Sequence, residues 1–295
     1  MNFEEILSFT FAWAKSGKSL KYYLVLFLVP IILLAVLAVL ALSSLGPVIA
    51  SATQNPLSVY SPAFFGQAFG ALLSFFALFF LWALLYILIE VFLNAWVNVY
   101  ALRAKNLPVV QLSFGKFLGL IVLHIMQFLS LFFFPAGKRT RMIVWACIAL
   151  LILSFLVPLL FLLGLIYVPL YLAAVIYSTF RISMSTSIFL SKGTDAWRAI
   201  QESWALTHGK VLHILVAMIL IGIAAVVVGL VLNTLLSLLF TQLISPMTAN
   251  LNLGMTAAYI NNILAQTLAG FFYGPVVTLM GAFGVAALYA ELARK

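Results

Sequence analysis

Charged residues are scarce in this sequence, and acidic residues are the scarcest of them. Only 7% of the 295 residues are charged and six are acidic, whereas 66% are hydrophobic. A soluble domain carries roughly 25% charged residues, so this chain cannot cover itself with a polar surface. Apolar runs of about 20 residues, the length of a membrane-spanning helix, recur along it. The composition therefore predicts one all-α integral membrane domain over residues 1–295, a polytopic helical bundle.

Residues that carry catalytic, redox or metal chemistry are also few. The single cysteine, Cys147, cannot form an intrachain disulfide, and the three histidines do not have the spacing of metal ligands. Glu90 is the only acid deep inside a predicted span, so no paired carboxylates are available for acid–base catalysis. We therefore expect no enzyme activity, no metal and no cofactor. We also expect no nucleic-acid binding, because that needs a soluble basic surface.

The fifteen basic residues are clustered, with Arg181 as the single exception, and the positions of the clusters predict the topology. Short cytoplasmic loops of membrane proteins collect Lys and Arg, whereas two connections, 46–63 and 241–255, contain no charge. Placing every basic cluster inside the cell and both uncharged connections outside gives a multi-pass protein of the cell membrane with both termini cytoplasmic. The predicted transmembrane helices are six: 22–45, 64–102, 142–164, 166–191, 211–240 and 256–292.

Residues 117–134 are apolar but have basic residues on both sides. We interpret them as a re-entrant or in-plane helix. In the alternative topology they cross the membrane as a true span. A true span at 117–134 either places the basic turn 138–141 on the outer side of the membrane or requires 142–191 to cross as a single broken helix.

A polar segment, 193–210, separates two apolar runs. Thr194 or Asp195 can cap a helix that ends at Gly209, and tryptophan favours the headgroup level of a membrane. We therefore predict a short cytoplasmic interfacial helix. Its apolar residues at i, i+3 and i+7 are Trp197, Ile200 and Trp204.

The N-terminus has the same character. Asn2 and Glu5 form a capping pattern, and Trp13 supplies an interfacial anchor like Trp197 and Trp204. We therefore expect a second interfacial helix there.

Two stretches, 1–105 and 195–295, share an order of features. Each has a tryptophan and a Gly-Lys pair before an apolar run, then an uncharged connection and a long returning run that ends with tyrosine and basic residues. We interpret them as a weak parallel repeat that flanks a middle section, 106–194. The alternative is chance, since any two membrane hairpins share such borders.

Residues 199–210, AIQESWALTHGK, resemble the A-x-x-x-S-W-x-L-T-x-G segment of the glycerophosphoryl diester phosphodiesterase membrane-domain family. Arg181 is similar to the arginine in that family's fourth span. Residues 288–292 resemble its closing Y-x-[DE]-L-R pattern, although Ala293 precedes the arginine here. The match covers mainly 165–295. It implies a six-helix membrane module that lacks the phosphodiesterase domain from which the family takes its name, and it implies no hydrolase activity.

Glu90 and Arg181 are the only charged residues deep inside predicted spans. At 1.5 Å per residue, both lie roughly 16–20 Å from the cytoplasmic ends of their helices. A lone charge at mid-membrane costs at least about 2.5–3.5 kcal/mol, so we expect the two to pair. Their neighbours on the same helix faces complete a polar seam between spans 2 and 4: Asn94, Asn98, Ser178 and Ser185. The seam is either a binding site for a polar or anionic group or a contact that fixes helix packing.

His124 and Gln127 form a narrow polar strip on the 117–134 helix. The strip either lines a cavity or consists of buried side chains whose hydrogen bonds are satisfied.

These features predict a non-enzymatic membrane module that associates with lipid, with a protein partner or with a second copy of itself. Its basic clusters face anionic headgroups on the cytoplasmic side, which contribute roughly 1 kcal/mol per Lys or Arg. The alternative is a small-molecule or lipid transporter that uses the polar seam.

Overall fold

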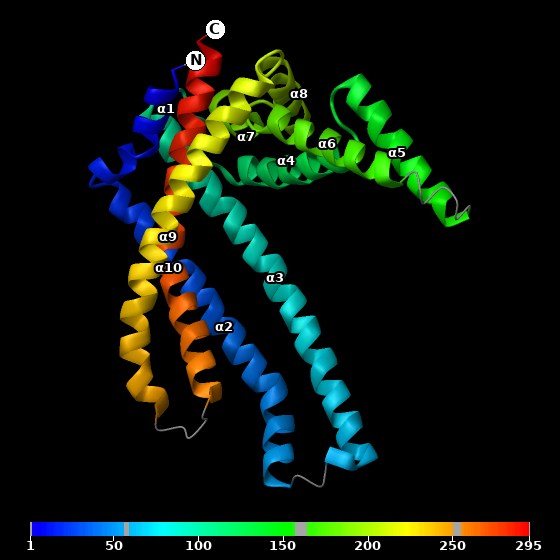
Figure 1. Ribbon diagram of the computed structural model, residues 1–295, viewed down its shortest axis with the longest axis vertical. Coiled ribbons are helices and arrows are strands. Elements are labelled where there is room, and N and C mark those ends of the chain that lie inside the picture. The colour runs from blue at the N-terminus through cyan, green and yellow to red at the C-terminus, as the bar shows by residue number, and fades with distance from the viewer. Residues whose placement is uncertain (1, 56–58, 157–163, 250–254, 295) are drawn as a thin grey trace. The chain divides into compact units, whose positions relative to one another are not determined.

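The computed structural model describes residues 2–55, 59–156, 164–249 and 255–294 (Figure 1). These residues form helices and no strand, which confirms the all-α prediction. The elements are α1 (Phe3–Thr10), the 3-10 helix η1 (Ala12–Lys15), α2 (Ser19–Gln54), α3 (Pro62–Ala104), α4 (Phe114–Phe132), α5 (Lys138–Leu156), α6 (Gly164–Ile182), α7 (Ser185–Lys192), α8 (Ala196–Leu206), α9 (Val211–Ala249) and α10 (Met255–Ala293).

Within the described residues, six helical segments are long and apolar enough to cross a membrane: Ser19–Gln54, Pro62–Ala104, Phe114–Phe132, Ile166–Lys192, Val211–Ile244 and Asn261–Ala293. The chain is therefore a multi-pass integral membrane protein. Five of these segments correspond to predicted spans. The sixth is α4, which has the length and composition of a span, so its in-plane placement stays a prediction. The predicted span 142–164 includes residues 157–163, which lie outside the described residues.

The contacts divide the chain into two compact units. The first comprises Met1–Ser19, Asn94–Val231 and Val276–Lys295, and the second comprises Leu20–Leu93 and Leu232–Pro275. The first unit contains α1 and α4 to α8 together with the adjoining parts of α3, α9 and α10. Nothing in this division tests the predicted repeat of 1–105 and 195–295.

The second unit consists of long apolar helix segments with few polar contacts. The Trp82 indole Nε1 donates to the Leu33 carbonyl at 2.9 Å, and the Tyr23 hydroxyl donates to the Phe272 carbonyl at 3.1 Å. Most large apolar side chains here are exposed, and the most apolar stretch of α3 has no buried residue. Such surfaces are stable where the surrounding solvent is lipid, because the bilayer core is itself apolar.

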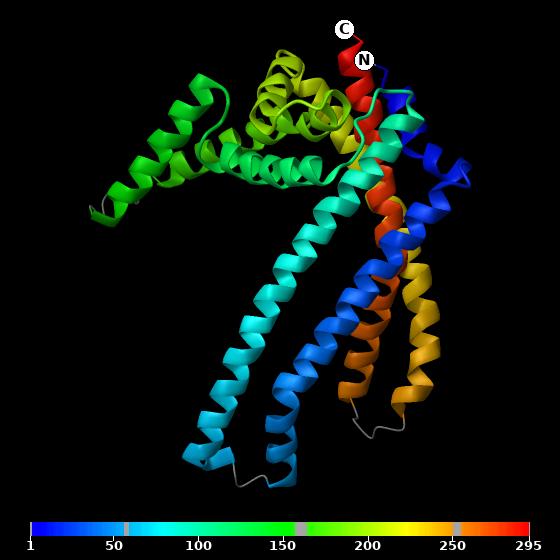
Figure 2. The ribbon, with the colours of Figure 1, turned by 180° about the vertical axis from the view of Figure 1, so that it is seen from behind.

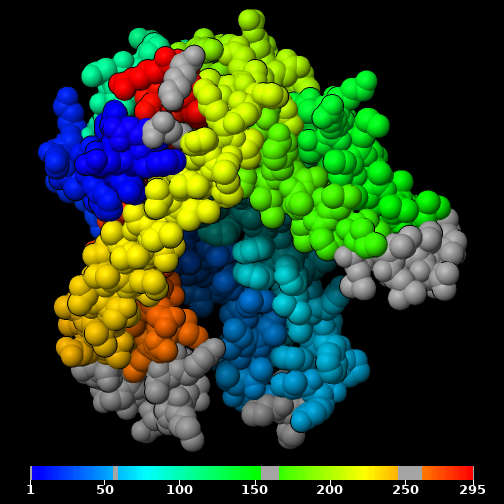
Figure 3. Space-filling view, turned by 45° about the horizontal axis from the view of Figure 1, so that its top comes forward, coloured from blue at the N-terminus to red at the C-terminus, as the bar shows by residue number. Residues whose placement is uncertain are grey.

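In the first unit, α1 lies against the C-terminal part of α10. The Phe9 and Phe283 rings stack with centroids 5.3 Å apart, and the Lys105 ammonium lies 4.7 Å from the centre of the Phe9 ring. Figure 3 shows the end of α10 (red) between α1 (blue) and the start of α9 (yellow). The predicted cap is confirmed, since the Asn2 side chain accepts from the Glu5 amide at 3.2 Å.

A turn at residues 183–184 divides the predicted helix 166–191 into α6 and α7. The predicted span corresponds to the apolar segment Ile166–Lys192, and the turn within it is a feature that the prediction did not include. Six of the eight residues of α7 are buried, and α4 packs against α6, α7 and α8 (Figure 2). The predicted depth of Arg181 in the membrane was counted along a continuous helix to Lys192. Because the turn interrupts that helix, the count no longer gives the depth.

Close approach of α9 and α10 depends on a glycine. A Cβ added at Gly284 would lie 2.8 to 2.9 Å from three side-chain carbons of Ile221. These carbons include both γ positions of a β-branched side chain, which has little freedom to move away. Gly284 therefore allows the two backbones to pack closely, as small residues do between membrane helices.

We predict that Gly284→Leu destabilises the protein by about 1–3 kcal/mol through overpacking. Thermal unfolding in detergent measures this as a lower midpoint. Gly222→Leu is the matched control, because no atom lies within 4 Å of a Cβ at that position. Adding Ile221→Ala should restore part of the loss. An unchanged midpoint for Gly284→Leu would contradict the close contact.

An ion pair also links α1 to the end of α3. The Glu5 carboxylate lies 2.5 Å from the Lys105 ammonium and 3.9 Å from the Arg294 guanidinium. The hydrogen bond and charge of Lys105 lower the pKa of Glu5 below its ordinary value of 4.5.

The stabilisation from this pair should be fully present above pH 4.5 and lost as the pH falls through the lower folded-state pKa. Glu5→Gln should therefore lower the unfolding midpoint at about pH 7 and have less effect at about pH 3. Glu4→Gln, on the exposed neighbouring residue, is the control. Equal effects of Glu5→Gln at both pH values would rule out the ion pair as the cause.

Candidate functional site

Arg181 lies in the last turn of α6 and is 2% exposed. Its Nη1 donates to the Tyr177 hydroxyl at 3.0 Å, and its Nη2 donates to the Trp204 carbonyl of α8. The guanidinium carbon also lies 4.8 Å from the centre of the Trp204 ring and 5.6 Å from that of Tyr177. The arginine is therefore held between two aromatic rings and two neutral acceptors.

The main chain of Arg181 is tied to the same helix. Its carbonyl accepts from the Ser203 hydroxyl at 2.8 Å and from the Thr207 hydroxyl at 3.2 Å. The serine, tryptophan and threonine of the S-W-x-L-T segment thus all contact the one arginine. Residues that the family resemblance singled out separately converge in one cluster, Arg181, Ser203, Trp204 and Thr207.

The predicted helix 193–210 is present in a shorter form. The Asp195 side chain caps α8 by accepting from the Arg198 amide at 2.9 Å, and Gly209 follows the helix with φ +69°, a conformation that favours glycine. One predicted anchor, Trp197, is 37% exposed. Trp204 instead packs on Arg181, and a Cβ at Gly137 would lie 2.5 Å from its ring. The third predicted interfacial anchor is Trp13. Its indole nitrogen is buried and has no acceptor among the described residues.

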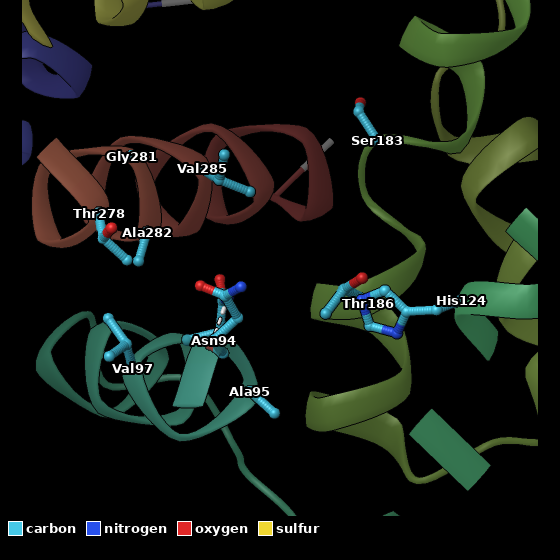
Figure 4. Close-up of a pocket in the computed structure, with 11 residues that line it drawn as sticks. Asn94, Ala95, Val97, His124, Ser183, Thr186, Thr278, Gly281, Ala282 and Val285 are labelled. Atoms are coloured by element: carbon cyan, nitrogen blue, oxygen red, sulfur yellow. Dashed lines mark hydrogen bonds between the residues drawn. The ribbon is translucent and has the colours of Figure 1, made fainter. Parts of the chain in front are cut away.

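A second feature of the first unit is a pocket of about 420 Å³, which we call the polar pocket (Figure 4). It lies between the C-terminal part of α3, α4, the α6–α7 turn and α10. Its polar lining residues are all uncharged or imidazole side chains: Asn94, Asn98, His124, Ser183, Thr186 and Thr278. In Figure 4 the Asn94 side chain points toward α10, and His124 lies beside Thr186 on the opposite wall.

Two polar side chains of the pocket wall bond to backbone carbonyls of their own helices. His124 Nδ1 lies 2.8 Å from the Leu120 carbonyl, which can only accept, so Nδ1 carries the proton. In the neutral ring, Nε2 is then an acceptor. Asn98 Nδ2 donates to the Asn94 carbonyl at 2.7 Å.

Gln127 also contacts this wall. Its amide donates to Ser185 at 2.7 Å and to Thr186 at 3.2 Å. This bond joins α4 to the start of α7.

The predicted seam is thus distributed over different places. Asn94 and Asn98 of the seam line the polar pocket together with His124 of the separate 117–134 strip, whereas Arg181 lines a different cavity with Trp204. Ser185 is bound by Gln127. The Ser178 hydroxyl is buried without an acceptor or donor among the described residues.

Glu90 belongs to the second unit, where it is exposed on α3. Its pairing with Arg181 stays a prediction.

Sequence reasoning missed three residues of the polar pocket: Ser183, Thr186 and Thr278. The run of serines and threonines at 183–187 was a signal for the first two. A threonine in the apolar run of α10 was the signal for the third.

Comparison with known proteins adds no relative. No protein-family model matches the chain, and neither a curated protein nor a solved structure is significantly similar to it.

We predict that Trp204→Leu lowers the stability of the protein by about 1–2 kcal/mol, because it removes a desolvated cation–π contact with Arg181. Trp197→Leu is a matched control on the same helix, where the ring is exposed. Thermal unfolding of both variants in detergent measures the difference. If both substitutions shift the midpoint equally, the ring of Trp204 does not stabilise the arginine.

Proposed function

We propose that this integral membrane protein is a non-enzymatic module that binds lipid, with an uncharged polar headgroup in the polar pocket. The observation that carries the proposal is the lining. Asparagine, serine, threonine and histidine side chains converge there, and no lining residue bears a formal charge. Amide donors and hydroxyl or imidazole acceptors match a headgroup rich in hydroxyl groups, such as a sugar or glycerol moiety.

The outer face of α4 favours a lipid over a free solute as the occupant. This face is an exposed apolar stripe at helical spacing, formed by Leu118, Val122, Ile125 and Phe128. The same helix turns His124 and Gln127 toward the pocket and α7. Acyl chains can lie along the stripe while the headgroup reaches the pocket beside it.

The topology and the family belong to the same proposal. Both termini are placed in the cytoplasm on the basis of the basic clusters. Membership of the glycerophosphoryl diester phosphodiesterase membrane-domain family is supported by the convergence of Ser203, Trp204 and Thr207 on Arg181. The proposal includes no chemical step.

A second candidate is transport of a small polar solute. The size of the polar pocket favours it, since about 420 Å³ is within the range of small-molecule sites. If the protein is a transporter, the pocket is one solute-binding site along the transport pathway rather than a lipid-binding site.

Native mass spectrometry of the full-length protein tests the lipid proposal. The purified protein is mixed with equal amounts of monoglucosyl diacylglycerol and diacylglycerol, which differ only in the sugar. We expect preferential retention of the glucolipid. Asn94→Leu should reduce its retention about tenfold, because it removes polar contacts worth about 1.4 kcal/mol.

Asn262→Leu is the matched control, since Asn262 is an exposed asparagine of α10 outside the pocket. Equal retention of both lipids, or no effect of Asn94→Leu, would overturn the lipid proposal. Saturable uptake of a polyol by proteoliposomes, lost in Asn94→Leu, would favour transport instead.

A further inference from the structure

We propose a second ligand site in this protein, a phosphate-binding site at Arg181. It is separate from the polar pocket. The proposed ligand of the polar pocket is uncharged, whereas the ligand of this second site is an anion. The site is a cavity of about 450 Å³ beside α8, which we call the arginine cavity. Its lining residues are Ala136, Arg181, Gln201, Trp204, Ala205 and His208.

The positive charge of Arg181 is not balanced within the first unit. The guanidinium is 2% exposed and its described hydrogen-bond partners, the Tyr177 hydroxyl and the Trp204 carbonyl, are neutral. A buried charge without a counter-ion is costly. The contacts with the two aromatic rings offset only part of that cost.

The acids of the first unit are engaged elsewhere. Glu5 pairs with Lys105 and Arg294, and Glu202 pairs with Lys192 and Arg198. Asp195 caps α8, Glu291 accepts from the Asn2 amide, and Glu4 is exposed on α1. Among the described residues of this unit, no carboxylate is therefore bound to Arg181. An anion from outside the chain supplies the missing charge.

Arg181 also keeps unused donors. A guanidinium has five N–H groups, and two of them have acceptors among the described residues. The buried Nε is without an acceptor there. The planar fork of an arginine matches the oxygens of a phosphate, which is why arginine recognises such groups at buried sites.

The rest of the lining points to a phosphate that carries an apolar tail. Gln201 and His208 lie on exposed positions of the α8 segment and add polar groups, whereas Ala136, Ala205 and the Trp204 ring make an apolar wall. Tryptophan beside arginine is suited to the headgroup level of a bilayer. We therefore take an anionic phospholipid as the source of the phosphate rather than the free ion.

The test is native mass spectrometry of the full-length protein with phosphatidylglycerol and diacylglycerol. The wild type should retain phosphatidylglycerol at least about tenfold better. Arg181→Gln should abolish that preference, and Arg139→Gln, on an exposed arginine of α5, should leave it intact. Equal retention by the wild type and Arg181→Gln would overturn the proposal. Displacement of the lipid by excess inorganic phosphate would show that the free ion is the ligand and would overturn the lipid source.

Arg181→Gln also removes contacts that hold α8. A second variant therefore keeps the test valid if the Arg181→Gln protein fails to fold. Ala205→Trp leaves Arg181 and its bonds in place and fills the cavity from an exposed position. It should lower phosphatidylglycerol retention about tenfold. Full retention by a folded Ala205→Trp protein would place the lipid elsewhere and overturn the proposal.

Two further variants separate this site from the other candidates. Asn94→Leu should leave phosphatidylglycerol retention unchanged, so failure of the polar pocket does not imply failure here. Glu90→Gln should also leave it unchanged. An increase in retention with Glu90→Gln would show that Glu90, rather than an external anion, neutralises Arg181 and would overturn the proposal.

Discussion

The contact between Arg181 and α8 holds the end of α6 on α8 in the first unit. Both the carbonyl and the guanidinium of this residue bond to α8, at Ser203, Trp204 and Thr207. Because the end of α6 is held on one helix, the chain between them has little choice of path, and α7 is buried between its neighbours. The α4 helix packs on the resulting surface. The bonds of Arg181 to α8 are joined by the Gln127–Ser185 bond between α4 and α7 and by the Lys192–Glu202 ion pair between α7 and α8.

The break at 183–184 separates two chemical environments that lie close together in the sequence. Arg181 precedes it and lines an amphiphilic cavity with Trp204. Ser183 and Thr186 lie at the break and just after it, and they line a pocket without formal charge. A continuous helix would carry these side chains around a single axis. The turn lies between the charged and the uncharged groups, and these groups line different cavities.

Local signals in the sequence predicted local structure well. Asn2 and Asp195 cap helices as expected, because a cap depends on residues three positions apart. Hydropathy alone predicted five of the long apolar segments. The break after α6 was missed because residues 182–186 contain no proline or glycine, and the bonds that Arg181 makes to α8 just before the break are tertiary contacts. The contact of Gly284 with Ile221 was missed for a similar reason, since it depends on the neighbouring helix.

The imbalance between fifteen basic and six acidic residues has a structural consequence. Each of the acids Glu5, Asp195, Glu202 and Glu291 holds a helix end or joins one helix to another. Few carboxylates remain to pair with the other Lys and Arg residues, and anionic headgroups contribute about 1 kcal/mol for each basic residue near a membrane surface. The same shortage of acids leaves Arg181 without a carboxylate partner among the described residues of its own unit. Both consequences follow from one compositional fact.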